Sequence, residues 1–165
     1  MSTEAEQLAR SLDRQRATLL RKTADLSAEQ LRRTHPPSTL TLAGLLNHSA
    51  LNEHWWFAVR LAGEQPQEPW ASVDFDADPE WEMRDALTLE PEELRGRYAA
   101  ACERSREIVR GLAGKDGLDT LAAAGERQGE RLDARWIVLH MIEETARHAG
   151  HADLIRESID GVVGE

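Results

Sequence analysis

Residues 136–157, WIVLHMIEETARHAGHADLIRE, combine apolar side chains with glutamates and three histidines. On a helix that advances by about 100° per residue, Glu144 lies in the middle of the face that carries Ile137 and Met141. His148 lies on the same face, one turn further along. A carboxylate directed into a core is costly unless a cation, a metal ion or strong donors pair with it. The spacing of Glu144 and His148 therefore predicts two ligands of one metal ion.

The other polar residues of this segment have different predicted positions. Glu143 lies on the flank of the helix, where Arg147 four residues on makes an ordinary ion pair. A rise of about 16 Å separates His140 from His151, so one ion cannot bind both. We expect His140 to be a core histidine or a residue that supports a ligand from behind. His151 could support His148 in the same way, or act as a ligand in an alternative His148–His151 pair.

A second segment, residues 42–63, supplies a further candidate ligand. On a helix measured from Leu45, His48 lies on the inward flank, whereas His54 lies about 180° away and is expected to face solvent. His48 could bind the same ion as Glu144. A core histidine with satisfied hydrogen bonds, or the partner of a buried acid, would fit the same position.

Aromatic residues follow His48 closely in this segment. Trp55, Trp56 and Phe57 are consecutive, and Asn52 lies one turn after His48 on the inward side. Core packing is the simpler interpretation of the aromatic cluster. The sharper interpretation is a substrate pocket in which Asn52, Trp55 and Trp56 form part of the wall.

Four long stretches with helical periodicity must position these residues. Thr3 with Glu6, and Ser27 with Gln30, have the spacing of capping boxes, which places helix starts at both points. The long helices are predicted from residue 3 to 23, from 39 or 41 to 62, from 91 to 112, and from 133 to 159 with Gly161 as the stop. Residues 64–89 are irregular, residues 114–132 are glycine-rich and expected to be a loop, and no strand pattern is evident. The sequence thus predicts an all-α fold, a four-helix bundle with a long crossover between helices 2 and 3.

Composition narrows the class of protein. A chain of 165 residues predicts one domain, spanning residues 1–165. The net charge is −10 and no basic cluster stands out, which argues against nucleic-acid binding. No apolar run approaches the roughly 18 residues of a membrane span. The single cysteine, Cys102, and a charged amino-terminal segment favour the cytoplasm, with Cys102 as a buried structural thiol.

The segments LAGLLNHSALNEHWWF and EETARHAGHADLIRESIDG together resemble the DinB-like superfamily, over nearly the whole chain. The nearest branch is similar to the actinobacterial DinB-like proteins of unknown function. The superfamily also includes the mycothiol-dependent maleylpyruvate isomerases and the bacillithiol S-transferases. The resemblance implies an up-and-down-type four-helix bundle with a long crossover, and a homodimer.

The same resemblance implies a ligand set. The family motif is a histidine on the second helix and a pair spaced four residues apart on the last helix. His48 matches the first, His148 the last, and Glu144 stands where many members have histidine and the mycothiol-dependent isomerases have glutamate. His151 stands where many members have glutamine. The chain therefore resembles the His/Glu/His variant of the metal site.

Two functions from different classes are expected on this basis. The first is a divalent-metal-dependent S-transferase or isomerase, in which zinc, or alternatively nickel, activates a small thiol such as mycothiol to attack an electrophile. Two histidines and one carboxylate leave coordination positions open, which is typical of a catalytic site. The alternative is a non-catalytic, dimeric helical bundle with a metal-binding or stress-related role.

Overall fold

The computed structural model describes residues 2–112, 117–127 and 129–164. Within these ranges the chain is mostly helical, and one small antiparallel hairpin accompanies the helices. The long helices are α1 (Glu4–Lys22), α3 (Leu42–Glu53), α5 (Pro91–Gly111) and α6 (Ala134–Asp160). A π-helical segment, η1 (His54–Leu61), continues α3 without a break. The short elements are α2 (Ala28–Leu31), η2 (Trp70–Ser72), α4 (Trp81–Asp85), η3 (Gly117–Asp119), β1 (Leu121–Arg127) and β2 (Glu130–Asp133).

The helix starts follow from capping side chains. Both capping boxes predicted from the sequence form: the Thr3 hydroxyl accepts from the Glu6 backbone N–H, and the Ser27 hydroxyl accepts from that of Gln30. The Asp133 carboxylate accepts from the Trp136 backbone N–H and begins α6. These contacts satisfy N–H groups that have no partner inside the helix.

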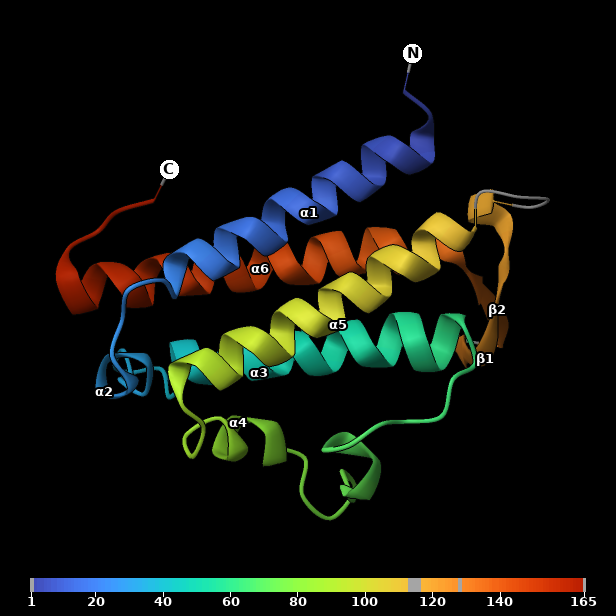
Figure 1. Cartoon of the computed structure of the whole chain (residues 1–165). Helices are drawn as coiled ribbons and strands as arrows, with labels where there is room; N and C mark the ends of the chain where they lie inside the picture. Colours follow the sequence, from blue (N-terminus) through green and yellow to red (C-terminus); the bar gives the residue numbers. More distant parts are fainter. Residues whose placement is uncertain (1, 113–116, 128, 165) are drawn as a thin grey trace.

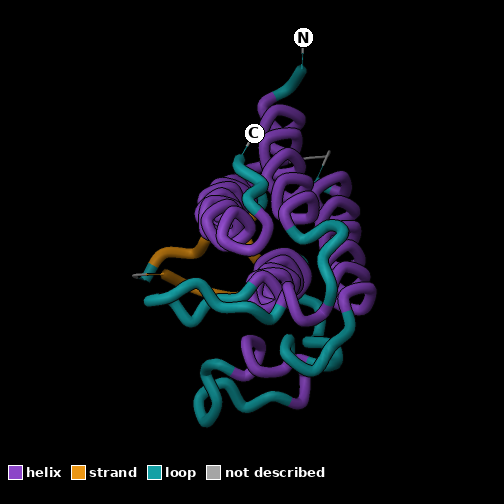
Figure 2. The backbone as a smooth tube through the Cα atoms, turned by 90° about the vertical axis from the view of Figure 1, so that its left-hand side faces the viewer, coloured by secondary structure: helices purple, strands orange, loops and turns teal. Residues whose placement is uncertain are grey.

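Figure 1 shows how the long helices are arranged. Helices α3 and α5 run side by side in the same direction, while α1 and α6 run in the opposite direction. Because α3 and α5 begin at the same end, the chain must return along the length of the helices between them. Residues 62–90 make this return and carry η2 and α4 along the outer face of α3. The predicted crossover thus has a geometric cause, and α4 packs against α3. The tube in Figure 2 shows the same layering from the end.

The prediction of a loop over residues 114–132 is wrong for residues 121–127 and 130–132, which form strands. Strands β1 and β2 form a hairpin in which Glu126 pairs with Arg131, with an irregular register between Leu121 and Glu126. Gly125 lies in this irregular stretch with a φ of 101°, and a Cβ there would be 3.0 Å from Arg60 Nη1. The hairpin packs against η1, and its Ala122 and Leu132 are buried. Residues 114–116 and 128, which the same prediction covered, lie outside the described residues.

Apolar side chains form two adjoining core clusters. One joins α3 to α5 and the end of α6 around Leu45, Leu46 and Tyr98. The other joins α1, η1, the hairpin and the start of α6 around Phe57 and Ile137. Among the described residues, no helix combines the length and apolar character needed to cross a membrane.

A bidentate ion pair crosses the interior between α1 and α3. Arg16 Nε is 2.7 Å from Glu53 Oε1, and Arg16 Nη2 is 2.5 Å from Glu53 Oε2. Both side chains are buried. Burial opposes the charge on Arg16, but the Glu53 carboxylate overcomes that cost and raises the pKa of the guanidinium. The ion pair holds α1 against α3 at Glu53, which lies five residues after His48 in the sequence.

Candidate metal centre

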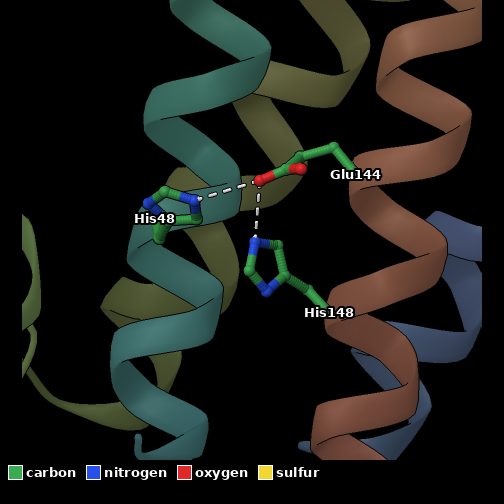
Figure 3. A group of neighbouring side chains, drawn as sticks. All are labelled: His48, Glu144 and His148. Atoms are coloured by element: carbon green, nitrogen blue, oxygen red, sulfur yellow. Dashed lines mark hydrogen bonds and ion pairs between the residues drawn. The ribbon is translucent and has the colours of Figure 1, made fainter.

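The structure brings His48, Glu144 and His148 together between α3 and α6 (Figure 3). One ligand atom from each residue lies within 4.8 Å of the other two. Glu144 Oε1 is 3.0 Å from His148 Nε2 and 3.6 Å from His48 Nε2. The three side chains are 22%, 17% and 12% exposed, in chain order, so the group is largely buried yet reachable from one side.

Antiparallel packing of α3 and α6 explains which residues meet. Moving along α3 and η1 from His48 to Trp56 corresponds to moving back along α6 from His148 to His140. The rings of His48 and His148 are 4.9 Å apart, and those of Trp56 and His140 are 4.5 Å apart. Eight residues of helix are about 12 Å long, so His140 belongs to a separate layer. Two layers of ring contacts therefore join these helices. The layer of His48 and His148 also contains Glu144.

Opposing effects act on the Glu144 carboxyl. Burial favours its neutral form, but His148, Arg147 and His48 together hold its pKa below the ordinary value. Arg147 bridges the two adjacent acids, with Nη1 3.0 Å from Glu144 Oε2 and Nη2 2.9 Å from Glu143 Oε1. The expected Glu143–Arg147 ion pair is thus present, and the same arginine also contacts the buried acid. Glu144 is an anion directed at two imidazoles.

Burial is the main cause that lowers the pKa of His148, and the neighbouring His48 adds to it, while Glu144 acts in the opposite direction. A lowered pKa favours the neutral imidazole, the form that binds metals. His151 lies behind His148, with the Nδ1 atoms of the two rings 3.4 Å apart. His151 is thus placed to contact the ring nitrogen of His148 that points away from Glu144.

Glu82, which the sequence did not identify, contacts His48 from the crossover. Its Oε1 is 3.1 Å from His48 Nδ1, and the Glu82 side chain is 9% exposed. On the other side of the ring, Asn52 Nδ2 is 2.9 Å from His48 Nε2. Because an amide nitrogen donates, Nε2 is the acceptor and Nδ1 carries the proton toward Glu82. Carboxylates commonly orient metal-binding histidines in this way.

The donor set fits a divalent ion. The Glu82 contact leaves the lone pair of His48 Nε2 on the side of Glu144, whose Oε1 is also an acceptor. Asn52 supplies an N–H to His48 Nε2, and His148 Nε2, 3.0 Å from Glu144 Oε1, can supply another; a bound ion would replace both hydrogen bonds. Two imidazole nitrogens and one carboxylate suit zinc and other first-row ions. His48 is thus both the partner of a buried acid and a candidate ligand, two interpretations that the sequence left open.

The residues predicted to line a pocket separate into two places. Asn52 and Trp55 line a cavity of about 520 Å³ between α3 and residues 73–76 of the crossover. Trp56 instead packs between Arg60, which lies 4.6 Å over its ring, and the rings of Trp136 and His140. His140 stacks on Trp136 with their ring centroids 5.0 Å apart. Trp56 and His140 therefore belong to the aromatic layer away from the metal centre.

The prediction that His54 faces solvent is wrong. His54 is 7% exposed, stacks on Trp70 with ring centroids 4.8 Å apart, and accepts a 3.1 Å hydrogen bond from the Gln67 backbone N–H. The angular argument placed His54 about 180° from Leu45. However, the crossover and α5 cover that face of the helix. A helical wheel cannot show which outer faces a connection will cover.

Comparison with known proteins identifies the family. Residues 7–161 match the family described as Mycothiol-S-transferase, so the chain belongs to this DinB-like family. A crystal structure of a conserved protein from Enterococcus faecalis superposes with a TM-score of 0.76 at 15% sequence identity, over 98% of this chain and 100% of that one. At that identity the likeness concerns the fold alone. No significant relative was found among curated proteins.

Proposed function

We propose that this protein is a divalent-metal-dependent S-transferase that uses a mycothiol-type thiol, with His48, Glu144 and His148 as the metal ligands. The observation that carries the proposal is the convergence of these three ligand atoms between α3 and α6. Membership of the Mycothiol-S-transferase family supports the thiol. Zinc is the expected ion and nickel the alternative.

When bound, the ion would lower the pKa of a coordinating thiol and so provide a thiolate at neutral pH. The chain's own residues would hold this arrangement in place. Glu82 keeps the proton of His48 on Nδ1, and His151 contacts Nδ1 of His148. Arg147 holds Glu144 as an anion from the solvent side. The packing of α3 against α6 excludes water from the inner side of the group.

A second function remains in competition because the polar group is satisfied without an ion. His148 and Arg147 already pair with both oxygens of Glu144, and Asn52 donates to His48. Such a network is compatible with a non-catalytic bundle with a binding or stress-related role, in which these contacts only join α3 to α6.

Elemental analysis of the purified, untagged protein tests the proposal. We expect about one zinc or nickel ion per chain, lost in His48→Ala/His148→Ala and weakened in Glu144→Gln. A matched control is His140→Ala, because His140 lies between the same helices but outside the ligand group. Absence of metal after addition of zinc or nickel would support the non-catalytic bundle. If metal is present, turnover of mycothiol with an electrophile is measured next, and chelation should abolish it.

We also propose that the protein forms a homodimer and is located in the cytoplasm. The family resemblance supports a homodimer, which light scattering of the untagged protein would test. The single, buried and free thiol of Cys102 is compatible with the cytoplasm.

A further inference from the structure

The cavity beside the metal centre has a definite chemical character. Its apolar wall comes from Leu51 and Trp55 of α3 and η1, and from Val73 and Phe75 of the crossover. A cavity of about 520 Å³ with such a wall suits the apolar or aromatic body of a small molecule. Because the two sides come from different parts of the chain, the crossover is needed to complete it.

Asn52 links this cavity to the metal centre. Its side chain lines the cavity, and its amide nitrogen is 2.9 Å from His48 Nε2. His48 would use its Nε2 atom to bind the ion. A ligand in the cavity would therefore lie next to the proposed reacting group, with Asn52 between them.

The cavity has acidic side chains in its lining. Asp74 and Asp76 are its ionisable lining residues in the described part of the chain, and both are acidic. Asp74 Oδ1 accepts from the backbone N–H groups of Asp76 and Ala77, both at 3.1 Å, so a turn holds this carboxylate in place. The net charge of the chain, −10, has the same sign. Two negative charges at the rim oppose the entry of an anion.

We propose that this cavity binds the electrophilic substrate, and that it selects uncharged or cationic apolar molecules against carboxylates. That the ligand is a substrate rests on the proposed function, whereas the selectivity follows from the residues that line the cavity. Two exposed charges at about 6 Å in water disfavour an anion by about tenfold in affinity.

A matched pair of unreactive probes tests the selectivity: 1,3-dinitrobenzene, which is neutral, and 3,5-dinitrobenzoate, which adds one carboxylate. The metal-free full-length chain is used, so that the carboxylate cannot bind an ion. Binding is followed by NMR at the indole N–H of Trp55, assigned through Trp55→Phe. We expect the neutral probe to shift this signal, and the anion to bind about tenfold more weakly.

The variant Asp74→Asn/Asp76→Asn should reduce the difference between the probes several-fold. Asparagine keeps the acceptor oxygen of the turn, so the loop is preserved. The control variant Glu29→Gln/Glu157→Gln makes the same change in net charge at exposed positions on α2 and α6, and should leave the difference unchanged.

Equal or tighter binding of the anion to the unmodified chain would overturn the proposal, as would failure of both probes to shift Trp55. An equal response of the two double variants would also overturn it, because overall charge would then explain the selectivity. These readouts need neither metal nor thiol. Absence of metal in the elemental analysis would therefore contradict the proposed metal-dependent reaction. The binding of the two probes would still test the selectivity of the cavity.

Discussion

Glu82 Oε1 lies 3.1 Å from Nδ1 of His48, and so the crossover contacts a candidate metal ligand on α3 directly. The other oxygen, Oε2, is buried and has no hydrogen-bond partner among the described residues. A buried carboxylate is costly unless its interactions compensate. The contact with the His48 ring N–H is therefore the feature that accounts for an acid at this position.

Replacement of Glu82 by glutamine should weaken zinc binding by about tenfold. This lies at the low end of the effects known for residues that support metal ligands, because the amide oxygen can still accept from His48 Nδ1. Competition with a zinc chelator measures the affinity, and circular dichroism confirms the fold. Glu80→Gln is the matched control, since Glu80 is exposed beside the same helix. Unchanged affinity in Glu82→Gln, together with weakened affinity in Glu144→Gln, would reduce Glu82 to a structural role.

The features that could be predicted from the sequence are those that depend on neighbours along the chain. Capping boxes at Thr3 and Ser27 involve residues three positions apart, so sequence spacing defines them. The inward direction of Glu144 and His148 follows from helical periodicity within α6. Their convergence with His48 required a resemblance to known proteins, because periodicity does not say which helices are neighbours.

The features that could not be predicted depend on the path of the connections. Burial of His54 arises from the crossover folding back over α3, and Glu82 reaches His48 along the same path. The hairpin escaped prediction because its strands contain alanine and glycine and lack alternating apolar residues. The contacts of His54 and Glu82 join segments whose relative placement is set by tertiary packing.

His54 should make the stability of the protein depend on pH. Burial lowers its pKa below 6.5, against the opposing effect of Glu64, and its Nε2 must stay unprotonated to accept from Gln67. A histidine with a lowered folded-state pKa contributes stability above its unfolded pKa, and loses it as the pH falls through the folded value. We therefore expect the stability advantage of the unmodified chain over His54→Gln, about 1 kcal/mol at pH 8, to decrease by pH 5.

Urea denaturation of both proteins at pH 8 and pH 5 measures this difference. His35→Gln is the control, because His35 lies in the linker between α2 and α3 rather than under the crossover. An advantage that grows on acidification would contradict the assignment of Nε2 as an acceptor. Metal content should be the same in His54→Gln and the unmodified chain, since His54 is not in the ligand group.

The Arg16–Glu53 pair should show strong coupling. Arg16→Met leaves the Glu53 carboxylate buried without its partner, and Glu53→Gln leaves Arg16 with only Asp13, so each variant should reduce the free energy of unfolding by about 3–5 kcal/mol. The double variant should cost much less than the sum, because no charge is then left without its partner. Chemical denaturation of the four proteins completes the cycle. Asp13→Asn, at a half-exposed partner of the same arginine, should have a small effect.

Cys102 should be unreactive in the folded protein. Burial, with a further contribution from Glu53, raises the pKa of its thiol to about 12, so only about one thiol in ten thousand is ionised at pH 8. The side chain is also 1% exposed, which blocks a reagent from reaching it. We expect 5,5′-dithiobis(2-nitrobenzoate) to label Cys102 of the folded protein at the rate of global unfolding. Labelling of the protein unfolded in urea should be immediate. Fast labelling of the folded chain would instead show that Cys102 is an accessible, ionised thiol and would contradict its burial.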